Sequence, residues 1–436
     1  MREIKKKFSF YSILKSFSSA LDLVSTEIIG HHRQTTYIAL VIAQEMGLSK
    51  DEIKKLLTAS LIHDIGIFYL DQNLDDLSFD KDDNNHALVG YYLLKDSFPV
   101  KDVAKILRYH HLRWSDYQEI NNKEYVSDLS HILFLADRIS TLLLNRSPKD
   151  ILIRYRGIAK IIRSKSGQYF KPEAVKAFNK IAQKEYFWLM AVNSNAFNQV
   201  LEDYFADCSY KIDIEEFIKL SQLISHIIDF RSPFTATHSD GVAVIARETA
   251  AYMGFDKEEQ KIFQIAGFLH DIGKLAIPLD ILNKEGSLNN KEWSIMKSHS
   301  YYSYYILDQS KELQDIKEWA SYHHERLNGK GYPFHLKGES LSIPARIMAV
   351  VDVFTAITEE RPYRKGMDIE QSKQVLEDLS NKNMLDKKIV RLILDHFHHF
   401  NTLRKETQKN ARAEFDSFKE LIEEEVLLKS MKKKVV

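Results

Sequence analysis

The sequence is poor in cysteine: Cys208 stands alone among 436 residues. A single cysteine cannot form an internal disulfide, and it excludes a zinc site built from several thiolates. Long hydrophobic runs are missing as well, since no segment approaches the roughly 18 uninterrupted apolar residues of a membrane-spanning helix. The basic residues 1–7 precede an apolar run that Lys15 interrupts, and no signal-peptide cleavage site follows. We therefore expect a cytoplasmic protein without membrane association.

Glycine and proline are scarce too, with 15 and 8 residues respectively. So few turn-forming residues in so long a chain leave room for long regular segments. Residues 214–229 and 243–253 place apolar side chains three and four positions apart, which is typical of amphipathic helices. The sequence therefore predicts an all-α fold.

The chain also has no excess charge of either sign. Its 61 basic and 61 acidic residues give a formal net charge of +0. No overall electrostatic field would attract nucleic acid or an anionic membrane, so we expect neither as a partner. A phosphate-bearing ligand would have to be bound locally, by metal ions or by individual Arg and Lys side chains.

What the chain does contain is one pattern of histidines and aspartates written twice. His31 precedes the pair His63-Asp64 by 32 residues, and His238 precedes the pair His270-Asp271 by the same 32 residues. The other landmarks recur at a separation of 213 or 215 residues: His86 with His299, His110 and His111 with His323 and His324, and Asp137 with Asp352. Because 10 of the 17 histidines follow this pattern, we interpret the chain as a tandem duplication.

A chain of this length is also expected to form two domains. We predict an N-terminal domain over 1–200, a helical connector over 201–212, a second domain over 213–403 and a charged C-terminal helix over 404–436. The acidic stretch 71–83 is expected to be a solvated loop. The terminal helix is amphipathic, so we expect it to pack on the body of the protein or on a second subunit of a homodimer. A patch that lies on a membrane surface is the alternative interpretation.

The second copy contains the side chains of a metal site. These are five histidines and two aspartates: His238, His270, Asp271, His299, His323, His324 and Asp352. Imidazole and carboxylate suit iron, manganese, zinc or nickel, and an aspartate can bridge two ions. Adjacent histidines diverge by about 100° on a helix, so His323 and His324 converge only where a helix ends, and residues 328–333 supply that end. A two-metal centre predicts hydrolysis of a phosphate ester.

The motifs of the second copy resemble those of the HD-GYP subgroup of the HD metal-dependent phosphohydrolases. They follow one another in order over nearly the whole copy: Thr237-His238-Ser239, His270-Asp271-Ile272-Gly273-Lys274, Lys297-Ser298-His299, His323-His324-Glu325-Arg326, Gly329-Lys330-Gly331-Tyr332-Pro333, Arg346, Asp352 and Arg361-Pro362-Tyr363-Arg364. The resemblance implies two tandem HD-type helical domains. The divergent N-terminal domain would be regulatory or accessory, and the C-terminal domain would hydrolyse cyclic dinucleotides.

The resemblance also assigns roles by matching position. The expected ligands form two sets that share Asp271: His238, His270 and Asp352 in one, and His299, His323 and His324 in the other. Lys274 would stabilise charge on the phosphoryl oxygens, while Arg361 and Arg364 would bind the second phosphate. The implied cofactors are two divalent transition metals, iron or manganese first and nickel or zinc as alternatives.

Phe234 bears on the number of metals, and two positions, Thr355 and Ser300, depart from the family pattern. Members with a third metal carry a glutamate four residues before the first histidine, where this chain has Phe234, so we expect two metals. Thr355 stands where the family usually has an aspartate, three residues after the metal-binding aspartate. We expect an altered hydrogen bond there, which would change metal choice or rate without abolishing binding.

All seven ligand positions recur in the first copy, as a candidate second metal site: His31, His63, Asp64, His86, His110, His111 and Asp137. Ile67 replaces the lysine, however, and residues 112–116 replace the Gly-Tyr-Pro loop, so we expect no cleavage of cyclic substrates there. Arg146 and Lys149 match the two arginines, which leaves phosphate binding open. Three interpretations compete: a structural or regulatory domain, a weaker phosphomonoesterase for the linear product, and a metal or ligand sensor.

The predicted activity is a phosphodiesterase that opens a cyclic dinucleotide to a linear one with a 5'-phosphate. Cyclic di-GMP (c-di-GMP) is the family default, but the tandem-HD architecture resembles enzymes that hydrolyse 3',3'-cyclic GMP-AMP (3',3'-cGAMP), and this analogy favours the latter. A broader HD nucleotidase or alarmone-hydrolase activity is an alternative that the Gly-Tyr-Pro loop argues against. A non-catalytic scaffold that docks onto nucleotide cyclases through residues 328–333 is the other, and the full ligand set with Lys274 argues against it.

Overall fold

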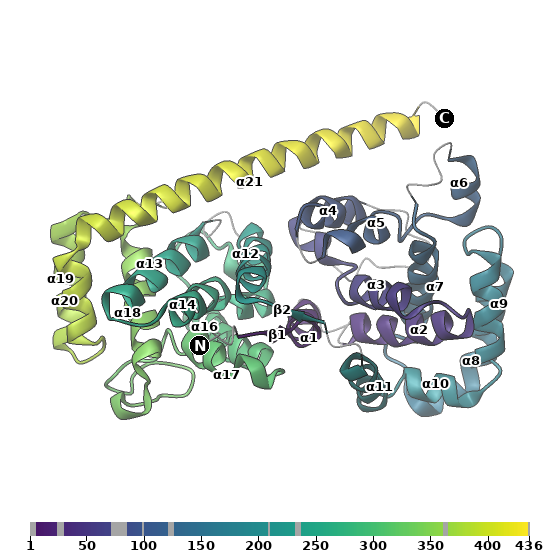
Figure 1. Cartoon of the computed structure of the whole chain (residues 1–436), viewed down its shortest axis with the longest axis horizontal. Coiled ribbons are helices and arrows are strands. Elements are labelled where there is room, and N and C mark those ends of the chain that lie inside the picture. The colour runs from purple at the N-terminus through teal and green to yellow at the C-terminus, as the bar shows by residue number, and fades with distance from the viewer. Residues whose placement is uncertain are drawn as a thin grey trace, which may run out of the picture. The chain divides into compact units, whose positions relative to one another are not determined.

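The structure is a computed structural model that describes residues 6–23, 30–70, 85–97, 100–120, 126–207, 210–231, 237–360 and 365–434. These residues are mostly helical (Figure 1), which confirms the all-α prediction. The strands among them are β1 (Phe8–Ser9) and β2 (Lys211–Ile212), which pair with each other. The chain divides into an N-terminal unit, Ser9–Lys211, and a C-terminal unit, Ile212–Val436 together with Met1–Phe8.

The N-terminal unit is a packed set of helices around α2, α3 and α7, which contact one another. Its helices are α1 (Phe10–Leu21), α2 (His31–Glu45), α3 (Lys50–Leu61), the 3-10 helix η2 (Ile65–Tyr69), α4 (Asn85–Leu94), α5 (Lys101–Arg108), α6 (Trp114–Glu119), α7 (Asp128–Leu143), α8 (Pro148–Ser164), α9 (Pro172–Ile181), α10 (Glu185–Ala191) and α11 (Ser194–Asp207).

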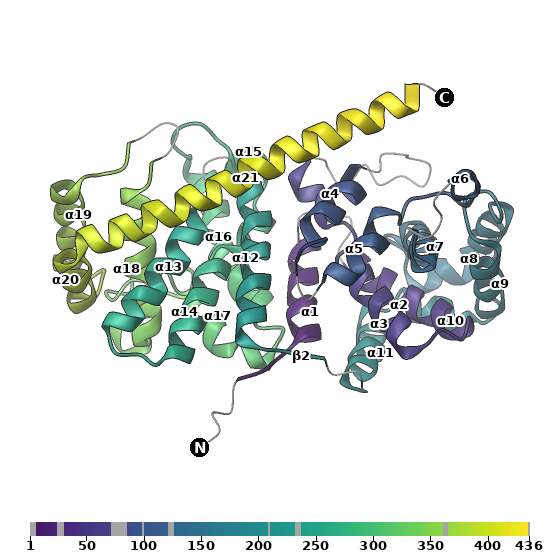
Figure 2. The ribbon, with the colours of Figure 1, turned by 45° about the horizontal axis from the view of Figure 1, so that its top comes forward.

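The C-terminal unit repeats this plan, with α13 against α14 and α18 (Figure 2). Its helices are α12 (Ile214–Phe230), α13 (His238–Tyr252), α14 (Lys257–Leu269), η5 (Ile272–Ala276), α15 (Leu279–Leu282), α16 (Asn290–Leu307), η6 (Lys311–Leu313), α17 (Gln314–Ser321), η7 (Gly338–Ser340), α18 (Ile343–Thr358), α19 (Ile369–Asn381), α20 (Lys387–Asp395) and α21 (Phe397–Lys434).

Matching local signals set the helix boundaries in the two units. Gly47 and Gly254, with φ of 74° and 85°, adopt the left-handed conformation just after α2 and α13, where glycine carries no steric penalty. The next helices, α3 and α14, begin with capping boxes in which Ser49 pairs with Glu52, and Asp256 with Glu259. The helix that starts with the first histidine and the helix that ends at the His-Asp pair are therefore defined locally in each copy.

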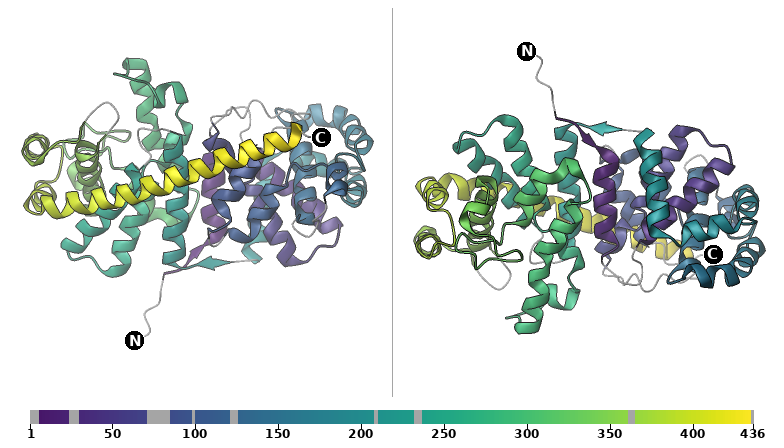
Figure 3. Two further views of the ribbon diagram at one scale, coloured as in Figure 1. Left: turned by 90° about the horizontal axis from the view of Figure 1, so that it is seen from above. Right: turned by 90° about the horizontal axis from the view of Figure 1, so that it is seen from below.

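The last helix, α21, has 38 residues and contacts α13 and α20. Figure 3 shows α19 and α20 beside its first turns. The buried side chains of α21 include Phe397, Phe400, Arg404, Gln408, Ala411 and Ile422. Within the ranges that the structure describes, no helix combines the length and the apolarity needed to cross a membrane.

Candidate metal centre

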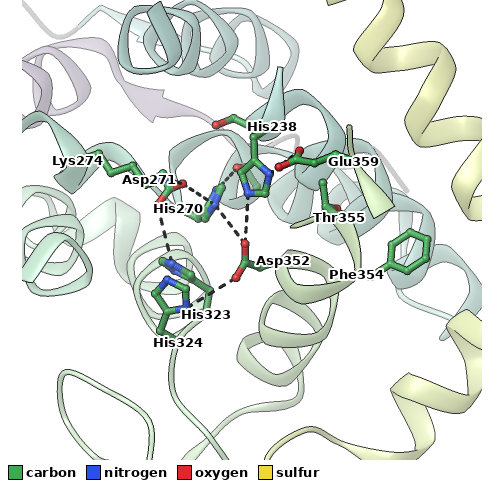
Figure 4. Close-up of polar contacts among 12 residues, drawn as sticks. His238, His270, Asp271, Lys274, His323, His324, Asp352, Phe354, Thr355 and Glu359 are labelled. Carbon is green, nitrogen blue, oxygen red and sulfur yellow. Dashed lines mark hydrogen bonds and ion pairs between the residues drawn. The ribbon is translucent and has the colours of Figure 1, made fainter. Parts of the chain in front are cut away.

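The seven side chains expected as metal ligands in the second copy converge on one place. Figure 4 labels all of them except His299. His238 is the first residue of α13, and Asp352 lies inside α18. His270 and Asp271 follow the end of α14, where the chain turns into η5. His299 lies in α16, and His323 and His324 follow the end of α17, as the divergence of adjacent side chains on a helix requires.

Two glycines let these elements approach closely. A Cβ on Gly273 in η5 would lie 1.9 Å from the carbonyl oxygen of His299. A Cβ on Gly267 in α14 would lie 2.4 Å from the Cα of Ala243 in α13. Real side chains cannot occupy such distances, so only glycine allows the His-Asp pair to sit against the helices that carry His238 and His299.

Asp352 lies at the centre of one group of ligands. Its Oδ1 is 3.3 Å from His238 Nε2 and 3.9 Å from His270 Nε2, and its Oδ2 is 3.8 Å from His324 Nδ1. One atom from each of His238, His270 and Asp352 falls within 4.8 Å of the others, and all three residues are buried. Asp352 therefore faces histidines from three segments of the chain.

Asp271 lies at the centre of the other group. Its Oδ2 is 3.1 Å from His270 Nε2, and its Oδ1 is 3.4 Å from His299 Nε2 and 4.0 Å from His323 Nε2. The two oxygens of this one carboxylate thus face different histidines. This is the arrangement that an aspartate needs in order to bridge two ions.

The hydrogen bonds of the imidazoles show that the donor set fits a metal. The Nδ1 atoms of His270, His299 and His323 lie 2.7, 2.6 and 2.5 Å from the carbonyl oxygens of Gly267, Met296 and Ala320. A carbonyl only accepts, so each Nδ1 donates and each neutral ring presents an Nε2 lone pair. The Nε2 of His270 is buried without a hydrogen bond although carboxylates surround it. A cation between these electron-pair donors resolves that conflict.

The electrostatics of the cluster also favour positive charge. Burial opposes a charged His238, but Glu359 and Asp352 outweigh burial and raise the pKa of this imidazole to about 10. Burial would likewise raise the pKa of Asp271, yet His270 and Lys274 hold it well below its usual range. The carboxylates thus stay ionised in a buried position, where a compensating cation is strongly held.

Lys274 lies beside the cluster, three residues after Asp271. Its Nζ is 2.5 Å from Asp271 Oδ2, and its side chain keeps 16% of its surface exposed. Burial lowers the pKa of Lys274, but Asp271 outweighs this effect and the net shift is upward. The ammonium group is therefore charged and held at the edge of the cluster.

A cavity of about 670 Å³ opens over this cluster. Its polar wall includes His238, Asp271, Lys274, His299, His324, Tyr332 and Asp352. Its apolar wall includes Ile281, Leu282, Leu288, Trp293 and Met296. A volume of this size is ordinary for a small-molecule site, and five of the seven predicted ligands line it.

The Gly-Tyr-Pro segment closes one side of the cavity. The Glu325 carboxylate accepts hydrogen bonds from the backbone N–H groups of Phe334 (2.7 Å) and Leu336 (2.9 Å). Gly331 packs so tightly that a Cβ would lie 2.4 Å from Glu325 Cα. The loop folds back as a result, and the Tyr332 ring lies 4.8 Å from the His324 ring.

Sequence reasoning missed Glu359. Its Oε2 lies 3.0 Å from His238 Nδ1, and Figure 4 shows it on the far side of His238 from Asp352. Thr355, where an altered hydrogen bond was expected, has a buried hydroxyl without a hydrogen-bond partner. The signal for Glu359 is its spacing, since it follows Thr355 by four residues, one turn along the same helix face.

Residues from α21 support Glu359 in turn. Gln408 Nε2 donates to Glu359 Oε2 (3.2 Å) and to the carbonyl oxygen of Thr237 (3.0 Å), the residue before His238. Arg404 donates to the carbonyl oxygen of Thr358 (3.0 Å) and hydrogen-bonds Gln408. The last helix of the chain therefore contributes to the surroundings of the first histidine of the cluster.

The seven candidate positions of the first copy also come together, in the N-terminal unit. His31 Nε2 lies 3.1 Å from Asp137 Oδ1, and His63 Nε2 lies 3.2 Å from Asp64 Oδ2. Two groups of buried ligand atoms form there: His31, His63 and Asp64, and Asp64, His86, His110 and His111. Ile67 is buried in η2, while Arg146 and Lys149 are exposed.

Several predicted features lie outside the described residues. They are the phosphate-binding arginines Arg361 and Arg364, Phe234, Cys208 and the acidic stretch 71–83.

Comparisons with known proteins agree with this geometry. Family models described as HD domain match residues 222–389 and residues 28–142. The 3'3'-cGAMP-specific phosphodiesterase 1 of Vibrio cholerae is 31% identical over 392 residues, which cover 86% of this chain and 89% of that protein. The cyclic di-GMP phosphodiesterase response regulator RpfG of Xanthomonas campestris is 37% identical over 145 residues, 33% of this chain and 38% of that protein.

A solved structure shares the fold. The crystal structure of a cyclic GMP-AMP-specific phosphodiesterase of V. cholerae superposes with a TM-score of 0.62 at 20% identity. The match covers 90% of this chain and 98% of that one, so it extends over both helical units.

Proposed function

We propose, from the premise that this chain belongs to the HD-GYP-type family of HD-domain cyclic dinucleotide phosphodiesterases, that it hydrolyses 3',3'-cGAMP to a linear dinucleotide with a 5'-phosphate. The observation that carries the proposal is 31% identity over 86% of the chain to a relative named for that substrate. The relatives named for c-di-GMP match less of the chain, 33% for RpfG and 39% for a phosphodiesterase of Thermotoga maritima. We therefore rank c-di-GMP second.

We further propose that two divalent metals bind in the C-terminal unit. His238, His270, Asp271 and Asp352 would hold one, and His299, His323 and His324 would hold the other together with Asp271. The ring nitrogens turned toward the two carboxylates support this assignment. Imidazole with carboxylate favours iron or manganese, with nickel and zinc as alternatives.

In the mechanism, the bound metals would supply the Lewis acidity that activates water and neutralises charge at phosphorus. Lys274 acts from the chain itself. Its ammonium group lines the cavity, and Asp271 orients it at 2.5 Å. It can donate to a non-bridging phosphoryl oxygen as negative charge develops there, in a site where part of the surrounding water is excluded.

The walls of the cavity suit the rest of a dinucleotide. Trp293 lines the cavity and keeps 45% of its surface exposed, so its flat ring is available to stack on a base. Tyr332, packed on His324, narrows the opposite side. Binding of the second phosphate by Arg361 and Arg364 stays a prediction.

Three further expectations also stay predictions: docking of nucleotide cyclases on residues 328–333, a homodimer, and a location in the cytoplasm.

The proposed function is tested by turnover of 3',3'-cGAMP, c-di-GMP and cyclic di-AMP side by side, with Fe²⁺ or Mn²⁺ supplied. We expect linear product fastest from 3',3'-cGAMP, and none from Asp271→Ala, which should also lose metal. Bound metal without turnover of any of the three would favour the scaffold interpretation instead. Undiminished activity in Asp271→Ala would contradict the site.

A further inference from the structure

The N-terminal unit holds a buried cluster that the proposed function does not use. The imidazoles of His31, His32 and His63 surround one oxygen of Asp64, with Nε2 to Oδ2 distances of 3.9, 3.6 and 3.2 Å. His31 and His63 also approach Asp137 Oδ1, at 3.1 and 3.6 Å. All five side chains are at most 4% exposed. Two carboxylates and three imidazoles thus share one dry position.

Hydrogen bonds fix which nitrogen of His32 and His63 carries the proton. His63 Nδ1 lies 2.9 Å from the carbonyl oxygen of Ser60, and His32 Nδ1 lies 2.7 Å from Asp22 Oδ1. Both partners accept, so both Nδ1 atoms donate. The Nε2 of each neutral ring is therefore a lone pair directed at the carboxylates.

The same holds for His31 through a short relay. Its Nδ1 lies 3.0 Å from Ser140 Oγ, and that hydroxyl donates its proton to Gln34 Oε1 at 2.6 Å. Ser140 must therefore accept from His31. The Nε2 atoms of His31, His32 and His63 are all buried without a hydrogen bond, as is Oδ2 of Asp64. Electron-pair donors that face one another in this way favour a cation between them.

His32 has no counterpart in the C-terminal unit. The equivalent position there, one residue after the first histidine, is Ser239, which hydrogen-bonds Asp229. The N-terminal unit thus presents one more imidazole at this position than the unit with the complete HD-GYP motif set.

A second ion position in the N-terminal unit is closed by Arg138. Its guanidinium lies 3.0 Å from His111 Nδ1 and 3.2 Å from Asp137 Oδ2, and the side chain is 3% exposed. Guanidinium only donates, so His111 Nδ1 accepts and the proton of that ring lies on Nε2. His111 Nε2 then donates to His86 Nε2, 2.9 Å away.

These contacts occupy the lone pairs that a second metal would need from His86 and His111. The positive charge of Arg138 also balances Asp137 in place of an ion. At the equivalent position the C-terminal unit has Val353, which brings no charge. At this position the two clusters therefore differ by one buried positive charge, which Arg138 supplies.

We propose that the N-terminal unit binds a single divalent transition metal through His31, His32, His63, Asp64 and Asp137, and that Arg138 excludes a second. Such an ion is enclosed by buried side chains and has Ile67 nearby in place of a lysine. It stabilises the unit rather than turning over a phosphodiester.

The first test counts metal in the full-length chain after loading with Mn²⁺ and gel filtration. We expect the His63→Ala plus Asp64→Ala variant to hold about one Mn²⁺ fewer than the unaltered chain. With the C-terminal centre emptied by His270→Ala plus Asp271→Ala, the remaining Mn²⁺ should give the spectrum of an uncoupled ion in electron paramagnetic resonance. A difference of zero, or a spin-coupled pair, overturns the proposal whatever the C-terminal unit binds.

The second test addresses Arg138 and His32 in that emptied background. Arg138→Val, which installs the residue of the C-terminal unit, should raise the Mn²⁺ content by about one, whereas Arg154→Val on an exposed helix face should not change it. His32→Ser should weaken Mn²⁺ binding by about tenfold or more. If Arg138→Val folds, as its thermal unfolding would show, without gaining Mn²⁺, or if His32→Ser binds unchanged, the assignment is wrong.

Discussion

At the scale of single residues, the first histidine of each cluster is oriented by a different partner. His31 donates to Ser140, while His238 is paired with Glu359. Thr355 is the C-terminal counterpart of Ser140, but its hydroxyl is buried without a hydrogen bond. Glu359, one helical turn further on, takes the role that position 355 leaves open. The hydrogen bond to the first histidine, which Ser140 makes in the N-terminal unit, is thus made by the charged Glu359 in the C-terminal unit and not by Thr355.

Glu359 should therefore act on the metal through His238. We expect Glu359→Gln to weaken metal binding by about tenfold, because the uncharged amide no longer strengthens the imidazole as a ligand. Activity at saturating metal should fall much less. Titration with Mn²⁺, followed by turnover, measures both quantities. Glu360→Gln, the exposed neighbour, is the control, and equal metal affinities in the two variants would refute the role.

Lys274 should act on rate alone. We expect Lys274→Ala to lower kcat by about 10²- to 10³-fold, the usual effect of losing one donor to a developing oxyanion, while bound metal stays the same. Metal analysis and steady-state kinetics on one preparation separate the two effects. Lys311→Ala, at an exposed position, serves as the control. If Lys274→Ala also loses metal, Lys274 helps to hold the metal site together and its effect on rate is indirect.

At the scale of elements, the site depends on how closely helices approach and on a helix remote in sequence. η5 contacts α16 only because Gly273 has no side chain. Gln408 of α21 lies 171 residues from Thr237, yet it bonds the backbone at the start of α13. Helix α21 therefore supports the surroundings of His238 in addition to packing on the unit.

Gly273→Ala tests the close approach. The added methyl group would meet the carbonyl oxygen of His299, so we expect α16 and η5 to separate, with a loss of about 2 to 4 kcal/mol in stability and reduced metal binding. Chemical denaturation and metal analysis check this. Gly157→Ala is the control, since its Cβ meets nothing within 4 Å inside helix α8, and it should be neutral or stabilising. Similar behaviour of the two variants would show that the packing is not tight.

At the scale of the whole molecule, one ancestral plan serves two unequal sites. The family models match both halves of the chain, as the repeated histidine spacing predicted. The C-terminal cluster faces a cavity with a lysine and an apolar wall. The N-terminal cluster is buried and carries its own cation, Arg138. Both copies thus keep the seven candidate ligand residues, but the side chains that surround these residues differ between the copies.

Ring opening should accordingly survive damage to the N-terminal cluster. We expect His63→Ala plus Asp64→Ala to retain most of the turnover of 3',3'-cGAMP, although the melting temperature should fall because a stabilising ion is lost. Product analysis and thermal unfolding of the same sample check both parts. Loss of turnover in a protein that is still folded would place chemistry in the N-terminal unit.

The sequence by itself determined the helical class, the duplication, the family resemblance and the seven candidate ligand residues of each copy. These follow from local spacing, such as the shared 32-residue separation that ends at His63 and His270. Only the tertiary structure decided which groups complete each cluster. Contacts between separate helices place Glu359, Gln408, His32 and Arg138 at the clusters. The spacing of residues along one sequence cannot indicate such contacts, because the direction of a side chain and the tautomer of a histidine depend on packing. For that reason two nearly identical ligand patterns lead to different sites.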